Sequence, residues 1–215
     1  MAEANVTTEV NVEVRSYFAT PVAVMQTPGF EVRNVALRET ILAREQATES
    51  NLHSNLGGWQ SSWDFHEWGG AAGREVIDGA IEVADKLTAD RAGKPVDIDW
   101  KYNSWANINR TGHANEFHAH PGCYWSVCYY VDDGGTGADA GLGGGFEIQD
   151  PRGVAPAMYA PLLGFSMPGG RSAGASELIQ PKTGMMIVFP SWLSHGVRPY
   201  TGTATRISIA INLSL

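Results

Sequence analysis

The last strand-like stretch of the sequence reads RISIAINLS over residues 206–214. Successive side chains of a strand point to opposite faces, so the isoleucines and Leu213 share one face. The other face carries Arg206, Ser208, Ala210 and Asn212. The aliphatic face must pack against a core or against helices. The polar face either meets solvent or lines a cavity, in which Arg206 could bind a carboxylate with the assistance of Ser208.

Other strand-like patterns lie between residue 96 and this last stretch. YWSVCYYV at residues 124–131 is a continuous run of β-formers, which is typical of a strand buried on both faces. Before residue 96 the period changes, and apolar residues recur at helical spacing over residues 31–48 and 71–90. Helices followed by many short strands predict an α+β fold, in which helices pack on a β-sandwich or a jelly roll.

A further strand is expected over residues 8–16. Three other segments are expected to be loops. Residues 52–70 hold three tryptophans and predict a long aromatic loop. Residues 132–145 are rich in glycine but lack the Gly-Lys-Ser/Thr of a phosphate loop. We expect them, with the Pro/Gly-rich residues 151–180, to flank the mouth of a cavity and to be more mobile than the sheet.

The length and charge of the chain exclude several classes of protein. Its 215 residues fit one domain, for which we expect helical support over residues 31–93 and a jelly-roll core over residues 96–215. A formal charge of -8 disfavours binding to nucleic acid or to anionic membranes. No apolar stretch reaches the ~20 residues of a spanning helix, and the N-terminus lacks the pattern of a signal peptide. The sequence therefore predicts a cytoplasmic protein, in which Cys123 and Cys128 are reduced thiols.

Three histidines are candidates for a metal site. His118 and His120 form a His-x-His pattern, and residues i and i+2 of a strand face the same way, so both imidazoles could reach one ion. His195 lies much further along the chain, between two strand-like stretches. Each feature taken alone also fits ordinary surface or core histidines.

The order of these residues, followed by Arg206 and Ser208, resembles the Fe(II)/2-oxoglutarate-dependent oxygenases. Their pattern is His-x-Asp/Glu, a distant histidine and then a basic residue that binds the C5 carboxylate of 2-oxoglutarate. Three further strings narrow the resemblance to a 2-oxoglutarate/iron oxygenase family of bacteria and phages, within the prolyl-hydroxylase-like superfamily. They are Ser104-Trp105-Ala106-Asn107, Ser126-Val127-Cys128-Tyr129-Tyr130-Val131 and Phe189-Pro190-Ser191-Trp192. The similarity covers most of the chain and implies a double-stranded β-helix, a jelly roll with the metal near one end.

The resemblance also implies a site and a reaction. His118, His120 and His195 would hold Fe(II), and Arg206 with Ser208 would bind 2-oxoglutarate as the co-substrate. Tyr130 is expected either to reach the same carboxylate or to pack in the core. No catalytic residue beyond the metal ligands is implied. The enzyme would use O2 to hydroxylate a small-molecule or peptide substrate and would release succinate and CO2. The identity of the substrate and the oligomeric state, a homodimer included, are left open.

One position departs from the family pattern, because His120 stands where Asp or Glu is expected. Three histidines can also hold Fe(II), and Glu116 is the alternative ligand. A cupin would carry a glutamate shortly after its His-x-His, where this chain has Tyr124 and Trp125. The alternative function is a non-catalytic, metal-stabilised jelly-roll binding protein, which would not bind 2-oxoglutarate.

Overall fold

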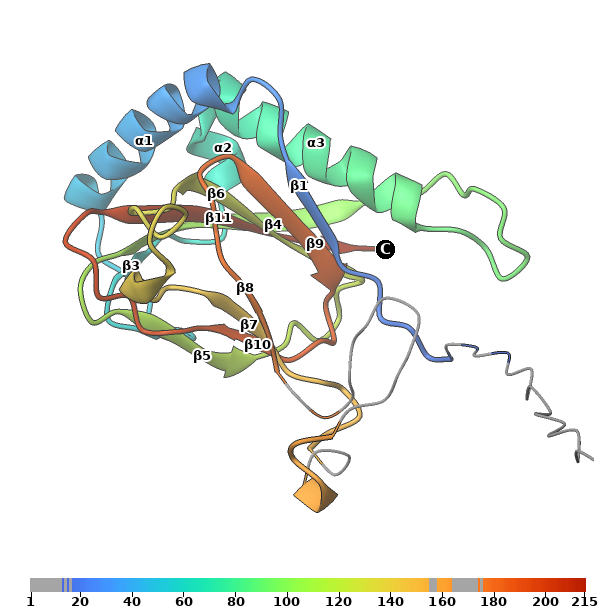
Figure 1. Cartoon of the computed structure of the whole chain (residues 1–215). Helices are drawn as coiled ribbons and strands as arrows, with labels where there is room; N and C mark the ends of the chain where they lie inside the picture. Colours follow the sequence, from blue (N-terminus) through green and yellow to red (C-terminus); the bar gives the residue numbers. More distant parts are fainter. Residues whose placement is uncertain (1–12, 14, 16, 155–157, 164–173, 175) are drawn as a thin grey trace, which may run out of the picture.

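Strand β11 (Arg206–Ser214) lies at the centre of the larger of two facing antiparallel sheets (Figure 1). The computed structural model of the chain describes residues 13, 15, 17–154, 158–163, 174 and 176–215. Within that part, the order of the large sheet is β1-β9-β6-β11-β4-β3 and that of the small sheet is β2-β5-β10-β7-β8. The other strands of the large sheet are β1 (Ala23–Gln26), β3 (Trp59–Gln60), β4 (Lys101–Asn109), β6 (Trp125–Asp132) and β9 (Met185–Pro190). Those of the small sheet are β2 (Asn55–Leu56), β5 (Ala114–His118), β7 (Phe146–Ile148), β8 (Glu177–Ile179) and β10 (His195–Val197).

The helices cover the outer face of the large sheet (Figure 1). They are α1 (Phe30–Ala47), α2 (Phe65–Trp68) and α3 (Gly70–Leu87). The aliphatic face of β11 packs here, as its alternation predicts, in one buried cluster with apolar residues of α1 and α3. That cluster includes Leu37, Ile41, Val76, Ile77, Ile207, Ile209, Ile211 and Leu213. The polar face of β11 therefore points the other way, toward the small sheet.

The inner face of the large sheet is formed by rows of paired residues. Ser208 of β11 lies opposite Asn107 of β4 and Tyr130 of β6. One row further along the strands, Ala210 lies opposite Trp105 and Cys128. The opposite sheet approaches this face through an apolar cluster. It comprises Tyr130, Phe146, Ile148, Met185, Ile187, Phe189 and Leu193.

One sequence-based prediction about local structure needs correction. The long aromatic loop predicted over residues 52–70 contains β2, β3 and α2, because its backbone pairs with β4 and β5. Trp59 is part of the core cluster, whereas Trp63 keeps 53% of its surface exposed. The strand predicted over residues 8–16 lies almost entirely outside the described residues. Among the helices of the part that the structure describes, none is long and apolar enough to cross a membrane.

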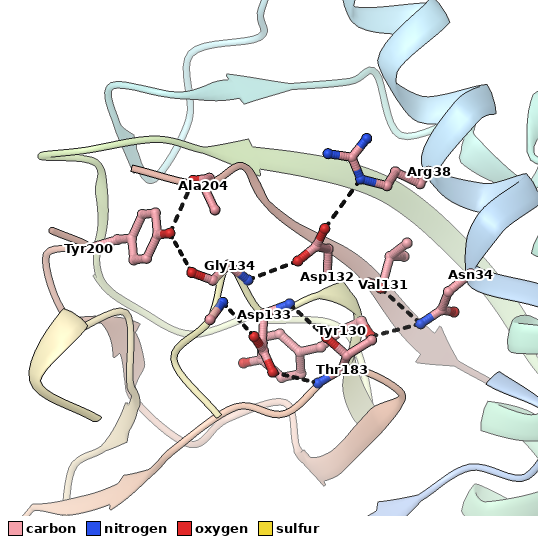
Figure 2. Close-up of polar contacts among 11 residues, drawn as sticks. Asn34, Arg38, Tyr130, Val131, Asp132, Asp133, Gly134, Thr183, Tyr200 and Ala204 are labelled. Atoms are coloured by element: carbon pink, nitrogen blue, oxygen red, sulfur yellow. Dashed lines mark hydrogen bonds and ion pairs between the residues drawn. The ribbon is translucent and has the colours of Figure 1, made fainter. Parts of the chain in front are cut away.

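The glycine-rich segment 132–145 is a loop, as predicted, with one short 3₁₀ turn (Ala140–Leu142). Figure 2 shows how its first residues are fastened. The Asp132 carboxylate accepts from Arg38 Nε of α1 at 3.2 Å, and the Asp133 carboxylate accepts from the Thr183 backbone N–H at 2.9 Å. The loop is therefore tied to both α1 and the turn before β9. Its greater mobility relative to the sheet remains a prediction.

The same loop also reaches the polar end of β11. The Tyr200 hydroxyl donates to the Gly134 carbonyl at 2.7 Å (Figure 2). Gly134 has φ +68°, and a Cβ there would lie 2.6 Å from the Tyr200 hydroxyl oxygen, so the position requires glycine. Further along the loop, the Gly144 carbonyl accepts from Arg206 Nη2 at 3.1 Å. The loop thus supplies one wall around the buried Arg206 side chain.

Candidate active site

Three imidazoles meet in the small sheet. One candidate ligand nitrogen from each of His118, His120 and His195 lies within 4.8 Å of the other two. The ring centroids are 4.4 Å apart for His118 and His195, 4.9 Å for His118 and His120, and 5.1 Å for His120 and His195. In the described part of the chain, this is the one group of three or more His, Cys, Asp or Glu side chains that could hold a metal ion.

Two of the histidines are brought together by strand register and the third by a turn. His118 lies directly opposite His195 across the β5–β10 pair. The expectation that His118 and His120 share a strand face is wrong, because β5 ends at His118. His120 belongs to the turn that follows, where its backbone N–H donates to the Ser191 carbonyl at 2.8 Å. This bond docks the turn against the segment after β9 and brings His120 to the other two rings.

Hydrogen bonds select the tautomer of two of the rings. His118 Nδ1 lies 2.7 Å from the Glu116 carbonyl, and His195 Nδ1 lies 2.8 Å from the Leu193 carbonyl. A carbonyl can only accept, so each Nδ1 carries the proton and each Nε2 of the neutral ring has a free lone pair. This is the arrangement that a metal-binding histidine requires.

Burial keeps these imidazoles neutral. Burial lowers the pKa of all three imidazoles and is the largest cause in each case. The pKa of His120 falls to about 4 and that of His195 to about 3. The neighbouring imidazoles act in the same direction, since adjacent positive charges would repel each other. At neutral pH the group therefore offers three uncharged nitrogen ligands, which suit a divalent first-row metal.

The alternative ligand Glu116 does not join this group. Its residue is exposed, and its carboxylate is not among the atoms that converge there. What Glu116 contributes is its backbone carbonyl, which orients His118. The converging set therefore contains imidazoles and no carboxylate.

Arg206 is the most deeply buried lysine or arginine of the described residues, with 1% of its surface exposed. Its Nη1 donates to Asn109 Oδ1 at 3.2 Å and its Nη2 to the Gly144 carbonyl at 3.1 Å. Its Nε has no hydrogen-bond partner, and no ion pair joins Arg206 to a carboxylate of the described residues. A buried charge without a counter-ion is costly, so the structure around Arg206 is suited to an anion that the described residues do not supply.

Tyr130 and Ser208 lie beside this guanidinium. The Arg206 Cζ atom is 5.1 Å from the Tyr130 ring centroid, and Ser208 lies opposite Tyr130 across the β6–β11 pair. Tyr130 is fully buried in the apolar cluster of the inner face, and its hydroxyl has no hydrogen-bond partner among the described residues. The Tyr130 ring therefore packs in the core, while its contact with a carboxylate remains a prediction. A carboxylate would satisfy the Tyr130 hydroxyl and Arg206 Nε together.

The residues that hold this framework in place were not predicted from the sequence. Asn109, opposite Arg206, fixes one end of the guanidinium. Behind the His120 turn, the Ser126 hydroxyl lies 2.7 Å from Asn212 Oδ1 and 2.9 Å from Ser191 Oγ. Strand parity shows that Asn212 shares the face of Arg206, but only the order of strands in the sheet shows which residues it meets.

Comparison with known protein families gives one match over this region. The family described as "Putative 2OG-Fe(II) oxygenase" matches residues 103–212. The matched segment runs from β4 into β11 and contains the three histidines, Tyr130, Arg206 and Ser208. No curated protein matches the sequence.

Solved structures with a similar fold include two prolyl hydroxylases. A Pseudomonas putida prolyl-4-hydroxylase is 13% identical, with 91% of this chain and 92% of that chain covered and a TM-score of 0.60. A Trichoplax adhaerens prolyl hydroxylase, solved in complex with a peptide fragment of the hypoxia inducible factor oxygen degradation domain, is 12% identical. There the coverage is 90% of this chain and 83% of that chain, with a TM-score of 0.61.

A third similar structure has a different activity. It is a non-haem α-ketoglutarate-dependent carbocyclase from nogalamycin biosynthesis, 8% identical, with 90% of this chain and 79% of that chain covered and a TM-score of 0.62. At such identities the likeness shows the fold, which is the α+β double-stranded β-helix expected from the sequence. Because the family match spans more than half of the residues and includes both the histidine group and Arg206, the chain belongs to the 2OG-Fe(II) oxygenases, enzymes that use Fe(II) and 2-oxoglutarate.

Proposed function

We propose that the protein is a 2-oxoglutarate- and Fe(II)-dependent dioxygenase that hydroxylates a small-molecule or peptide substrate and releases succinate and CO2. Residues 1–215 would act as a single oxygenase domain. The observation that carries the proposal is the pairing of three neutral imidazoles with a buried arginine that has no carboxylate partner among the described residues. The cytoplasmic location and a homodimeric state remain predictions.

The three histidines would hold the iron. His118 and His195 would bind it through Nε2, because their Nδ1 atoms are engaged by backbone carbonyls. His120 would complete the set from the turn after β5. Bound there, iron supplies the redox chemistry that couples decarboxylation of 2-oxoglutarate to oxidation of a substrate C–H bond.

Arg206 and Tyr130 would bind the carboxylate of 2-oxoglutarate that lies far from the iron. Arg206 Nε and the Tyr130 hydroxyl are donors without partners among the described residues, and Ser208, opposite Tyr130 on β11, offers its hydroxyl as a third donor. A carboxylate held there would fix the direction of the co-substrate and leave its 2-oxo acid end to face the histidines. The protein thus orients the reacting group by holding the end that does not react.

Apolar side chains beside the histidines would limit the entry of water. Phe146 stacks on the His195 ring at 5.3 Å, and Phe189 meets the same ring edge-on at 4.6 Å. Both residues are buried. A dry wall strengthens the interaction of charged groups in the site and protects an oxidising step from side reactions with water.

The proposal is tested with purified protein under controlled oxygen. Protein loaded anaerobically with Fe(II) is expected to bind 2-oxoglutarate and, once O2 is admitted, to form succinate and CO2 in equal amounts. A matched His118→Ala variant should form neither, whereas His113→Ala, which lies outside the histidine group, should behave as the wild type. A wild-type protein that takes up Fe(II) but does not bind 2-oxoglutarate would overturn the proposal in favour of a non-catalytic metal-binding protein.

A further inference from the structure

The inner face of the large sheet has two small, partly exposed residues between buried neighbours. On β6, Ser126 and Tyr130 are buried, while Cys128 between them keeps exposed surface. On β11, Ala210 is likewise the partly exposed residue between buried neighbours on the same face. Cys128 and Ala210 lie opposite each other in the sheet. Because residues in the interior of a sheet are otherwise closely packed, this row must face a space that solvent can enter.

One side of this row leads to the buried arginine. Tyr130 is the next residue of the same strand face, one row away, at a spacing of roughly 7 Å. Its hydroxyl and Arg206 Nε are the unpartnered polar atoms described above, and both residues are at least nine-tenths buried. The electrostatic influence of Arg206 reaches the Cys128 thiol as well as the Tyr130 hydroxyl.

On the other side of the row the next residue of β6 on this face is Ser126, whose hydroxyl lies 2.9 Å from Ser191 Oγ, and the Ser191 carbonyl accepts from the His120 backbone N–H. Trp105 is paired with Ala210, and its ring centroid lies 5.7 Å from that of His120. Cys128 packs against the apolar cluster that contains Phe146 and Phe189, the two rings that contact His195. The row of Cys128 and Ala210 therefore lies between the anion-binding residues and the candidate metal ligands.

The chemistry of the Cys128 side chain suits contact with methylene groups. Burial raises the pKa of the Cys128 thiol, and the nearby Tyr130, Arg206 and Ser208 only partly oppose that effect. The thiol is therefore neutral at physiological pH, and a neutral buried cysteine behaves as a small apolar side chain. The two ends of the space are polar, and its middle is not.

We propose that Cys128 is a specificity-determining residue for the co-substrate, because its side chain and that of Ala210 form the surface over which the methylene groups of the 2-oxo dicarboxylate lie. The inference rests on the proposed function and deepens it. The size of the side chain at position 128 sets the length of the 2-oxo acid that fits between Arg206 and the histidines. Cys128 takes part in no bond-making step, and its contribution is to the shape of the site.

The test compares the binding of 2-oxo dicarboxylates of different length. Oxaloacetate, 2-oxoglutarate and 2-oxoadipate, with four, five and six carbons, are titrated calorimetrically into anaerobic Fe(II)-loaded protein. Cys128→Ala should improve the binding of 2-oxoadipate relative to 2-oxoglutarate by about fivefold or more, since it enlarges the middle of the space. Cys128→Leu should weaken 2-oxoglutarate binding by about tenfold or more through overpacking, with Fe(II) affinity unchanged.

The second free cysteine provides the matched control. Cys123 lies in the turn after His120, outside the row, so Cys123→Ala should leave the order of the three affinities as in the wild type. If Cys128→Leu does not fold, the ratio of affinities in Cys128→Ala decides alone, and an unchanged ratio overturns the inference. That failure differs from a failure of the proposed function, in which the wild type itself would not bind 2-oxoglutarate.

Discussion

His118 and His195 lie directly opposite each other on β5 and β10, with their ring centroids 4.4 Å apart. Directly opposed residues of an antiparallel pair have adjacent Cβ atoms, so the register of two strands alone brings these imidazoles together. His120 then needs only a turn to reach them. Two of the candidate metal ligands are therefore as rigid as the small sheet itself.

Removing one histidine should abolish tight metal binding. His195→Ala takes away one of three nitrogen ligands and is expected to lower Fe(II) affinity by at least about 100-fold, since even the loss of a group that only hydrogen-bonds to a metal ligand costs about 10- to 100-fold. Anaerobic titration with Fe(II) measures the effect, and His66→Ala is the control because His66 lies outside the group. Equal affinity in His195→Ala and the wild type would contradict the ligand assignment.

The metal-free protein should lose stability as the pH falls below the ordinary histidine pKa of about 6.5. In the unfolded chain the histidines bind protons near that pH, whereas folded His120 and His195 stay neutral down to about 4 and about 3. The unfolded state therefore binds more protons across this window and is favoured as the pH falls. After a discount for the coupling between the histidines and for their partial exposure, the free energy of unfolding should fall by an amount of order 2–4 kcal/mol between pH 7 and pH 4.

Urea unfolding at a series of pH values measures this loss. His195→Gln removes one titrating group and should flatten the dependence. A dependence that is equally steep in His195→Gln would show that other groups cause it.

Arg206→Ala should weaken 2-oxoglutarate binding by roughly 30- to 1000-fold, because a charge-assisted guanidinium–carboxylate pair in a partly dry pocket contributes ~2–4 kcal/mol. Arg206→Lys should recover only part of the affinity, since a single ammonium cannot bind Asn109 and Gly144 and also replace the free Nε donor. Calorimetry on Fe(II)-loaded protein measures both, with the exposed Arg91 as the site of a control substitution to alanine. Unchanged affinity in Arg206→Ala would remove Arg206 from the co-substrate site.

Gly134→Ala should destabilise the protein more than Gly112→Ala. Both glycines have positive φ, at +68° and +87°, so both substitutions carry the strain of a left-handed backbone. Only at Gly134 would the new Cβ meet the Tyr200 hydroxyl, at 2.6 Å, whereas Gly112 has nothing within 4 Å. The expected difference is about 1–3 kcal/mol in the free energy of unfolding. Equal losses would show that the contact with Tyr200 relaxes easily.

The sequence predicted those features that depend on neighbouring residues along one strand. The parity of β11 separated Ile207 from Arg206 correctly, since the pleat alone decides which face a residue takes. The position of His120 was predicted for the wrong reason, because the end of β5 depends on the turn that docks against Ser191. The support of Arg206 by Asn109 and Gly144 depends on strand order and on a loop, and neither leaves a local pattern.

The way in which Arg206 is held has a consequence for the amount of folded enzyme. Neutral oxygens of Asn109 and Gly144 hold the guanidinium, and no described carboxylate balances its charge. A dianion that binds this site in the folded protein and does not bind the unfolded chain stabilises the fold by RT ln(1 + [L]/Kd), where [L] is its free concentration and Kd its dissociation constant. We therefore expect the resistance of this protein to proteolysis to rise with the concentration of its own co-substrate, so that the supply of 2-oxo acid would set both the rate of turnover and the lifetime of the catalyst.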